Sequence, residues 1–374
     1  MYIRLFNNFL LCAILLMPCW LSGKLTAQSF SPGQTYFGAN SYVEYRAGNL
    51  PIIISAPHGG DKTPAAIPDR ACPDAVTLND ANTQALSRQL DTAIQMRFGC
   101  YPHLIINRLA RRKLDANRDL PEAACGNPLA EQAWYDYHEF IDSAKNAVVA
   151  TYGRGIFIDL HGHAHTIQRL ELGYLLSGAE LRKPDDSLNL PAYVQESSIR
   201  RLAENNLHQY KHAQLLRDSF ALGTLLQAAG YPSVPSAADP APLAGEPYFN
   251  GGYNTYRHGS SQGGAIEAVQ IECYYAGVRD TWANRRQFAD TLALAVQVFL
   301  EKHLFDHAFI PDISGGETVC EDGIYTYSVP ALPGNSYLWM ASGGEILSGQ
   351  GSASVQVRWL TPGNGSITVM RLCP

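Results

Sequence analysis

Short apolar runs rich in β-branched residues alternate, between residues 40 and 305, with longer stretches that have the periodicity of helices. The apolar runs read LPIIISA, HLIINRL, GIFIDLHG, LELGYLLSG and IEAVQIECYY. In NDANTQALSRQLDTAIQMRFG, Leu86, Leu90 and Ile94 recur every four residues and would share one helix face. PLAEQAWYDYHEFIDSAKNAVVATYG and RDTWANRRQFADTLALAVQVFLEKHLF are also helical in pattern. The alternation predicts an α/β domain whose mixed, largely parallel sheet is flanked by helices.

Residues 232–263 interrupt this alternation, because they are rich in Pro, Gly and Ser. A long irregular stretch inside a compact domain usually has a function. Its aromatic residues and the pair Arg257-His258 favour a substrate-binding loop over a linker.

Residues 316–374 contain only short alternating runs, separated by turn signals such as PGN and SGG. The runs are IYTYSV, SYLWMAS, SVQVRWL and SITVMRL. They predict a small all-β sandwich. Its sequence resembles the immunoglobulin-like or PKD-like modules that are appended to exported bacterial enzymes. We expect this β-module to serve attachment to a cell surface, spacing or adhesion rather than to carry chemistry.

The first 27 residues have the pattern of a secretory signal peptide. Arg4 precedes an apolar stretch from Phe9 to Leu21, and small residues follow up to Ala27. The apolar stretch is too short for a transmembrane helix, which needs about 20 apolar residues. We therefore expect a secreted or cell-surface protein with no transmembrane segment and a catalytic domain over residues 28–308.

The composition of the mature chain argues against one class of partner, nucleic acids. The sequence is 46% hydrophobic over 374 residues, which is ample for a buried core. Without residues 1–27 it has 26 basic and 34 acidic side chains, a net charge of −8. Nucleic-acid binding requires a basic face, so we expect no nucleic-acid partner.

The cysteines point to disulfides rather than to a metal. Those that remain after the signal peptide are Cys72, Cys100, Cys125, Cys273, Cys320 and Cys373. An even number in an exported protein favours disulfides, and no CxxC pair is present for a thiolate zinc site. We expect a disulfide between Cys320 and Cys373, because these two bracket the β-module.

Three apolar runs deliver ionisable side chains near their ends. IIISAPH ends in His58, IFIDLHGH contains His161, and AVQIEC contains Glu272. Burying such groups costs several kcal/mol unless they are paired or bind a metal, and ligands of α/β sheets lie beyond the carboxyl ends of strands. Two histidines and a carboxylate are a frequent zinc ligand set. We predict one zinc ion per chain, held by His58 and His161, with Glu272 as the general base.

The identity of the carboxylate ligand stays open between Asp61 and Asp80 on these grounds. Asp61 follows His58 by three residues, in a turn. Asp80 lies where a helix is predicted to begin, a position at which aspartate often serves as an N-cap. His163 is expected to contact one of the metal-binding side chains rather than the metal itself. His165 is expected to lie on a surface loop.

A basic segment, residues 107–120, directly follows a predicted strand. Its sequence, NRLARRKLDANRDL, surrounds Asp115 and Asn117 with arginines and a lysine. Guanidinium groups suit substrate carboxylates and developing oxyanions. The segment is therefore predicted to bind substrate.

Five motifs together resemble the N-formylglutamate amidohydrolase family, over about residues 45–303. In the order of the family, they are APHGG, RRKLDANRD, IDLHGHAH, FNGGYNTYRHG and VQIE. The resemblance implies a zinc-carboxypeptidase-like fold and hydrolysis of an amide bond next to a carboxylate, with one zinc ion as cofactor. It matches His58 and His161 to family ligands and Glu272 to the acid of the QIE strand. It favours Asp80 over Asp61, because many members have an acid at the start of the next helix.

The resemblance also implies substrate contacts. Arg111 would polarise the scissile carbonyl, with Arg108 or Arg112 as alternatives. Asn117 and Arg118 would contact the carboxylate of the substrate. Arg257 and His258, in the irregular loop, would also contact the substrate.

Two features depart from that family, whose named activity is intracellular: the signal peptide and the β-module. We therefore expect a small-molecule or peptide substrate with a free carboxylate, such as an N-acyl amino acid, a peptide or poly-γ-glutamate. The alternative is a non-catalytic cell-surface binding protein that uses the same pocket. A serine hydrolase would need a G-x-S-x-G elbow after a strand, and HGSSQGG is not placed in that way.

Overall fold

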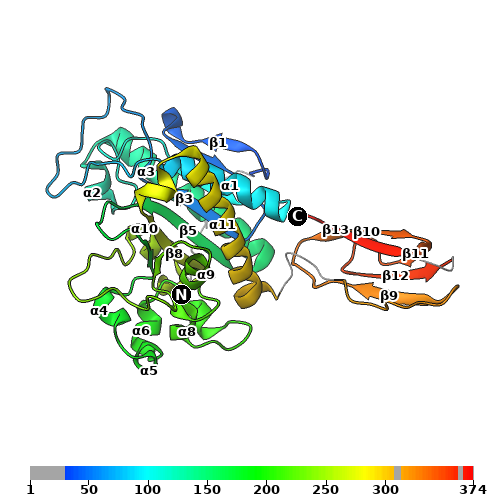
Figure 1. Cartoon of the computed structure of the whole chain (residues 1–374). Helices are drawn as coiled ribbons and strands as arrows, with labels where there is room; N and C mark the ends of the chain where they lie inside the picture. Colours follow the sequence, from blue (N-terminus) through cyan, green and yellow to red (C-terminus); the bar gives the residue numbers. More distant parts are fainter. Residues whose placement is uncertain (1–29, 307–312, 361–364, 374) are drawn as a thin grey trace, which may run out of the picture. The chain divides into compact units, whose positions relative to one another are not determined.

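In the computed structural model, which describes residues 30–306, 313–360 and 365–373, an eight-stranded sheet forms the centre of the α/β domain (Figure 1). The predicted signal peptide lies outside the described residues. The strands are β1 Thr35–Phe37, β2 Val43–Arg46, β3 Ile52–Ala56, β4 His103–Asn107, β5 Gly155–Gly162, β6 Leu170–Gly173, β7 Ser233–Val234 and β8 Ile266–Cys273. Their order is β1-β2-β4-β3-β5-β8-β6-β7. Strands β4, β3, β5 and β8 are mutually parallel, whereas β2 and β6 run antiparallel to them, so the predicted mixed sheet is confirmed.

Three long helices flank the sheet, at the three stretches where helical spacing was found. They are α1 Thr83–Phe98, α3 Pro128–Tyr152 and α11 Trp282–Leu300. The shorter helices are α2 Leu120–Ala124, α4 Gly178–Leu181, α5 Asp185–Leu188, α6 Pro191–Glu196, α7 Arg200–Glu204, α8 His212–Arg217, α9 Leu222–Ala228 and α10 Tyr253–His258. Within the described part of the chain, no helix combines the length and apolar character that crossing a membrane requires.

The two faces of the sheet differ in chemistry. Alternate strand residues join α1 and α11 in one apolar core: Ile52, Ile54 and Ala56 of β3, Ile156, Ile158 and Leu160 of β5, and Val269, Ile271 and Cys273 of β8. Because successive side chains of a strand point to opposite faces, Asp159, His161 and Glu272 point to the other face. Helix α3 packs against β3 and β5 and places Tyr137 beside Asp159 on that face.

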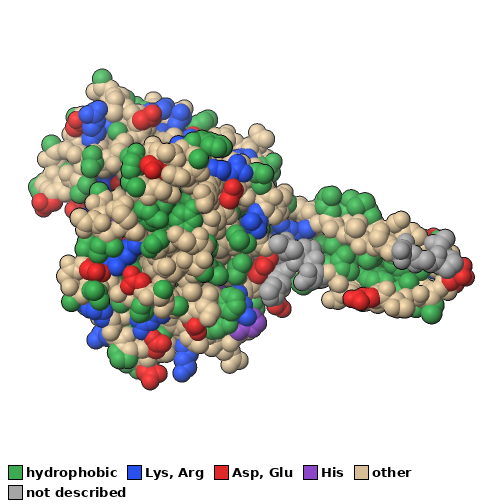
Figure 2. Space-filling model, in the orientation of Figure 1, with side chains coloured by type: hydrophobic (Ala, Val, Ile, Leu, Met, Phe, Trp, Pro, Cys, Tyr) green, Lys and Arg blue, Asp and Glu red, His purple; other side chains and the backbone are tan. Residues whose placement is uncertain are grey.

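Charge at the surface and charge on this face are organised differently. Acidic and basic side chains are interspersed on the face of the protein drawn in Figure 2. In contrast, Asp159, His161 and Glu272 are at most 5% exposed. Buried charge is costly unless it is compensated, so this polar face of the sheet needs a specific explanation.

The C-terminal residues form small antiparallel sheets, as predicted for an all-β module. The strands are β9 Ile324–Ser328, β10 Ser336–Ser342, β11 Gly344–Ser348, β12 Ser354–Trp359 and β13 Ser366–Leu372. Strands β11, β12 and β9 form one sheet, and β10 and β13 form another. Tyr337, Trp339 and Val357 are among the buried residues of its own apolar core.

The expected Cys320–Cys373 disulfide is wrong. Cys373 instead pairs with Cys100, and the Cα atoms of this pair are 5.9 Å apart. A second disulfide joins Cys72 and Cys125. Cys320 is free and exposed. Bracketing a module in sequence did not identify the pair, because β13 ends beside Cys100, where Arg371 also donates to the Phe98 carbonyl.

Candidate metal centre

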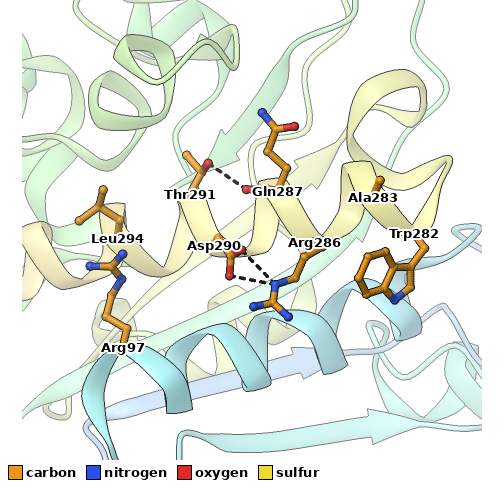
Figure 3. A pocket seen from close by; sticks show the side chains of 8 residues that line it. All are labelled: Arg97, Trp282, Ala283, Arg286, Gln287, Asp290, Thr291 and Leu294. Carbon is orange, nitrogen blue, oxygen red and sulfur yellow. Dashed lines mark hydrogen bonds and ion pairs between the residues drawn. The ribbon is translucent and has the colours of Figure 1, made fainter.

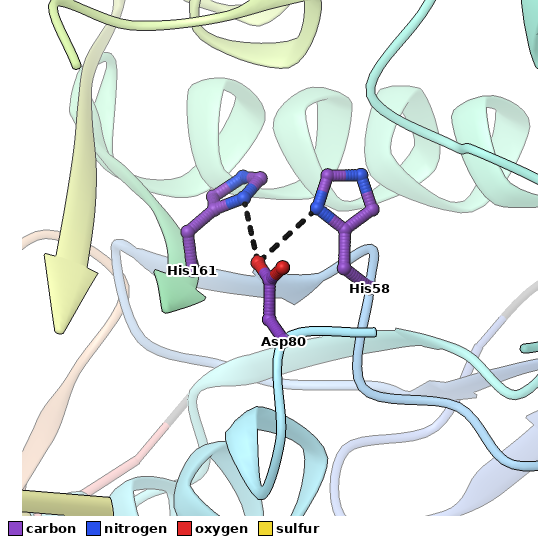
Figure 4. Close-up of side chains that lie close together, drawn as sticks. All are labelled: His58, Asp80 and His161. Atoms are coloured by element: carbon purple, nitrogen blue, oxygen red, sulfur yellow. Dashed lines mark hydrogen bonds and ion pairs between the residues drawn. The ribbon is translucent and has the colours of Figure 1, made fainter. Parts of the chain in front are cut away.

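His58, Asp80 and His161 converge beyond the carboxyl ends of β3 and β5 (Figure 4). Asp80 Oδ2 lies 3.2 Å from His58 Nδ1 and 3.4 Å from His161 Nδ1. All three residues are buried. Ligand atoms around a tetrahedral zinc ion, at bond lengths of roughly 2.0–2.1 Å, lie about 3.3 Å from one another. The donor types and their separations therefore fit zinc.

The parallel pairing of β3 with β5 brings the two histidines together, and a loop supplies the carboxylate. The Asp80 amide donates to the His58 carbonyl at 3.2 Å, and the Asp80 carboxylate accepts from the Gly162 amide at 3.1 Å. Asn82, and not Asp80, is the N-cap residue of helix α1. Asp61 is exposed. The structure thus brings Asp80, and not Asp61, to the two histidines.

Each histidine is also held from behind by a fully buried aspartate. His58 Nε2 lies 2.6 Å from Asp115 Oδ1, and His161 Nε2 lies 2.7 Å from Asp159 Oδ2. A carboxylate on one ring nitrogen orients the other nitrogen toward a metal and raises its basicity. Sequence reasoning missed both aspartates. Asp159 was detectable, because it precedes His161 by two residues and shares its strand face. Asp115 lies in the basic segment, but nothing local indicates that it reaches His58.

Electrostatics make the centre attractive to a cation. Burial opposes ionisation of the Asp80 carboxyl, but the imidazoles of His58 and His161 outweigh it and hold its pKa well below the ordinary range. Burial likewise opposes ionisation of Asp115, yet its histidine and guanidinium neighbours lower its pKa. Burial disfavours the charged form of His161, but Asp159 and Asp80 raise its pKa well above the usual value. Ionised carboxylates therefore persist in this buried site at neutral pH.

One arginine of the basic segment, Arg111, contacts the side chains of the centre. Arg111 Nε donates to Asp115 Oδ2 at 2.9 Å, and its Nη1 lies 3.4 Å from Asp80 Oδ1. Arg108 instead pairs with Glu44 at 3.7 Å. Arg112, the other alternative, is exposed and lies 3.7 Å from an exposed aspartate. Of the three arginines, Arg111 is the one that contacts the carboxylates of the centre.

Asn117 and Arg118 have different surroundings. Asn117 is buried, with Nδ2 3.5 Å from His161 Nε2 and Oδ1 accepting from the Asn254 amide at 2.8 Å. The side chain of Arg118 is 38% exposed and lies 3.4 Å from the carboxylate of Glu122. Asn117 therefore lines the centre, while Arg118 is accessible from solvent.

Arg257 and His258 make contacts away from the three residues of the centre. His258 is 1% exposed, with Nε2 2.9 Å from His138 Nδ1 of α3. Arg257 pairs with Asp142 of α3 at 3.2 Å. The helical turn explains this placement, because Asn254, earlier in α10, is the residue that faces the centre and donates to Asp159 Oδ1 at 3.3 Å. Their expected contacts with substrate receive no support from these positions.

Glu272 lies at the edge of the centre. It is the register partner of His161 on the adjacent parallel strand, and its Oε1 is 3.9 Å from His161 Nδ1. Gln270 Nε2 donates to the same oxygen at 2.9 Å. Burial raises the pKa of Glu272 to about 7, against the opposing effect of His161.

His163 and His165 depart from their expected positions. His163 Nε2 donates to the Arg169 carbonyl at 2.8 Å instead of contacting a ligand of the centre. His165 is half-buried, and its Nδ1 lies 2.8 Å from Glu171 Oε1. The strand β5 ends at Gly162, so the chain turns toward β6 before it reaches these two residues.

Arg279 is a further residue that sequence reasoning missed. Its Nε donates to the Cys273 carbonyl at 2.9 Å, its Nη2 donates to the His163 carbonyl at 3.0 Å, and its Nη1 donates to the Ala81 carbonyl. It is 3% exposed. One buried guanidinium thus joins the backbone segments that carry Glu272, His161 and Asp80.

Arg279→Lys is expected to lower the free energy of unfolding by about 2 kcal/mol or more, because an ammonium group cannot serve all three carbonyls and buried acceptors are left unpaired. Urea denaturation of the variant measures this change. Arg286→Lys is the control, since Arg286 pairs at the surface with Asp290 at 3.0 Å. Equal loss in both variants would contradict the bridging role of Arg279.

If the centre binds a metal ion, Asp159→Asn is expected to weaken that binding by about 10- to 100-fold, since the amide lacks the charge that raises the basicity of His161. Competition with a chromophoric chelator measures the dissociation constant. Asp142→Asn is the control, because Asp142 also lies near a histidine, 3.4 Å from His258 Nδ1, but outside the centre. Unchanged affinity in Asp159→Asn would show that the aspartate does not tune the ligand.

A separate surface groove lies between α1 and α11 (Figure 3). Its lining residues are Arg97, Trp282, Ala283, Arg286, Gln287, Asp290, Thr291 and Leu294. Arg286 and Asp290 neutralise each other there. The groove contains no residue of the metal centre, and its composition points to no reaction.

Comparisons with known proteins concern both parts of the chain. Residues 307–371 match the family model of the PKD-like domain. No curated protein matches the sequence. Among solved structures, N-formylglutamate amidohydrolase from Ralstonia eutropha JMP134 has a TM-score of 0.40 at 13% identity, over 71% of this chain and 95% of that chain. Succinylglutamate desuccinylase from Chromobacterium violaceum has a TM-score of 0.33 at 11% identity, over 89% of this chain and 96% of that chain.

Proposed function

We propose that this chain is an exported zinc-dependent hydrolase that cleaves an amide bond next to a carboxylate. The observation that carries the proposal is the opposed pairing of the two histidines. In each, Nδ1 faces Asp80 and Nε2 faces a buried aspartate, which is the arrangement of metal-binding imidazoles. Zinc bound by His58, Asp80 and His161 would supply a Lewis acid that polarises the scissile carbonyl and lowers the pKa of a water molecule.

The remaining chemistry falls to side chains around this site. Glu272 would accept a proton from the attacking water and return it to the leaving amine. Arg111 would stabilise negative charge on the carbonyl oxygen. Among the described residues, the Nη2 group of Arg111 has no hydrogen-bond partner, which leaves a donor for substrate.

The substrate side of the proposal rests on Asn117 and Arg118. A partly exposed guanidinium next to a buried amide would bind and orient a substrate carboxylate. The substrates proposed are N-acyl amino acids, peptides with a free carboxylate and poly-γ-glutamate. Residues 28–308 would carry the reaction after removal of residues 1–27, and residues 316–374 would attach the protein to a cell surface.

The test is metal analysis of the purified mature protein together with an assay against these three substrate types. We expect release of amine that stops when a chelator removes the metal and returns when zinc is restored. Ligand binding with stoichiometric zinc but no hydrolysis would instead support a non-catalytic binding protein. Hydrolysis that survives complete removal of metal would overturn the zinc-dependent reaction.

A further inference from the structure

A second group of ligand-type side chains lies beside the proposed catalytic site and has no role in the reaction described above. It comprises His163 and His165, in the turn after β5, and Glu171 of β6. Each residue offers one ligand atom, and these atoms all lie within 4.8 Å of one another. His163 and Glu171 are buried and His165 is half-buried.

The carboxylate of Glu171 lacks a fixed positive partner. It is fully buried and is the cross-strand register partner of Glu272, so both carboxylates point to the same face of the sheet. Its Oε2 accepts from the Phe249 amide at 2.7 Å, and its Oε1 lies 2.8 Å from His165 Nδ1. Among the described residues, no lysine or arginine pairs with it. Two neighbouring buried carboxylates are costly unless a cation lies close to them.

The arginine that directly precedes β6 does not supply that cation. Arg169 precedes Glu171 by two residues, but its Nη1 lies 3.0 Å from Asp239 and 3.0 Å from Glu246. Among the described residues, Glu171 Oε1 therefore has His165 Nδ1, and no lysine or arginine, at ion-pairing distance.

His163 offers Nδ1 as its ligand atom. Its Nε2 donates to the Arg169 carbonyl at 2.8 Å, which leaves the lone pair on Nδ1. That lone pair accepts a hydrogen bond from the His165 amide at 3.1 Å, which an ion bound at Nδ1 would replace, and the two imidazole rings are 5.0 Å apart. A carbonyl partner on one ring nitrogen is the usual support for a histidine that binds metal through the other.

We infer that His163, His165 and Glu171 bind a second divalent cation, separate from the one proposed at His58, Asp80 and His161. Two imidazoles and one carboxylate suit zinc or a similar borderline metal ion. The ion would lie between the imidazoles and the Glu171 carboxylate and would screen Glu171 from Glu272. The inference depends only on these contacts and stands or falls separately from the proposed reaction.

Metal counting on the full mature chain tests it. After dialysis against zinc and removal of free metal, elemental analysis is expected to give two ions per chain. His165→Ala and Glu171→Gln should each retain one, and His165→Ala combined with His58→Ala should retain none. His208→Ala, at an exposed histidine in neither group, is the matched control and should retain two.

The inference is overturned if the wild-type chain holds one ion, or if Glu171→Gln still holds two. Glu171→Gln preserves the shape of the side chain, so it decides the matter if circular dichroism shows that His165→Ala is unfolded. One ion per chain together with full hydrolysis would refute only the second metal site. Two ions per chain without hydrolysis would refute only the proposed reaction.

Discussion

His58→Ala is expected to release the metal of the centre and to reduce amide hydrolysis by about 10⁴-fold or more. The variant loses one of three ligand atoms and leaves the buried carboxylates of Asp80 and Asp115 without the imidazole that now lies between them. A metal ion contributes several kcal/mol to stabilising the transition state, and each 1.36 kcal/mol is tenfold in rate. Elemental analysis and steady-state assays of the purified variant measure the two losses together.

The matched control for this prediction is again the exposed His208. His208→Ala should keep both its metal and its activity, since it removes an imidazole outside the site. Thermal unfolding of both variants shows whether His58→Ala is folded. A folded His58→Ala protein with unchanged metal content and turnover would place the metal centre elsewhere.

Glu272→Gln is expected to bind the proposed zinc ion as the wild type does and to lose turnover by about 10²- to 10⁴-fold, the usual contribution of a general base. Glutamine keeps the size of the side chain, but it cannot accept a proton from water. The expected pattern is therefore a fall in kcat at unchanged metal content, measured on the same preparation. This pattern separates a base from a ligand.

Glu267→Gln is a demanding control, because Glu267 is also a buried glutamate of β8 and pairs with Ser260 at 2.7 Å. Burial raises its pKa to about 7, as it does for Glu272, so the two substitutions are matched in burial and in charge. Glu267→Gln should keep its activity. Loss of zinc from Glu272→Gln would make Glu272 a ligand, and normal turnover would exclude it as the base.

Several features of this protein could be predicted from local sequence. The apolar β-branched runs form the central strands, because only buried strands accommodate such residues on both faces. Parallel strands present their carboxyl ends at one edge of the sheet. For that reason, His58, His161 and Glu272 could be placed together from three separate motifs before any distance was known.

Other features depend on how distant segments pack. The basic segment holds several arginines of the same chemistry, and only the turn after β4 directs Arg111, rather than Arg108 or Arg112, toward the centre. Similarly, the turn of α10 directs Asn254 toward Asp159 and His258 toward α3. A side chain's direction depends on the rotation of its element against its neighbours, which no single stretch of sequence contains.

The sequence by itself determined the class of fold, the β-module and the strand ends from which a histidine pair and a glutamate emerge. These follow from local periodicity and from the cost of burying charge. Only the tertiary structure decided that Cys373 pairs with Cys100, that Asp115 holds His58, and that Arg279 joins the three backbone segments. Each of these contacts links residues whose proximity is created by the packing of the whole chain.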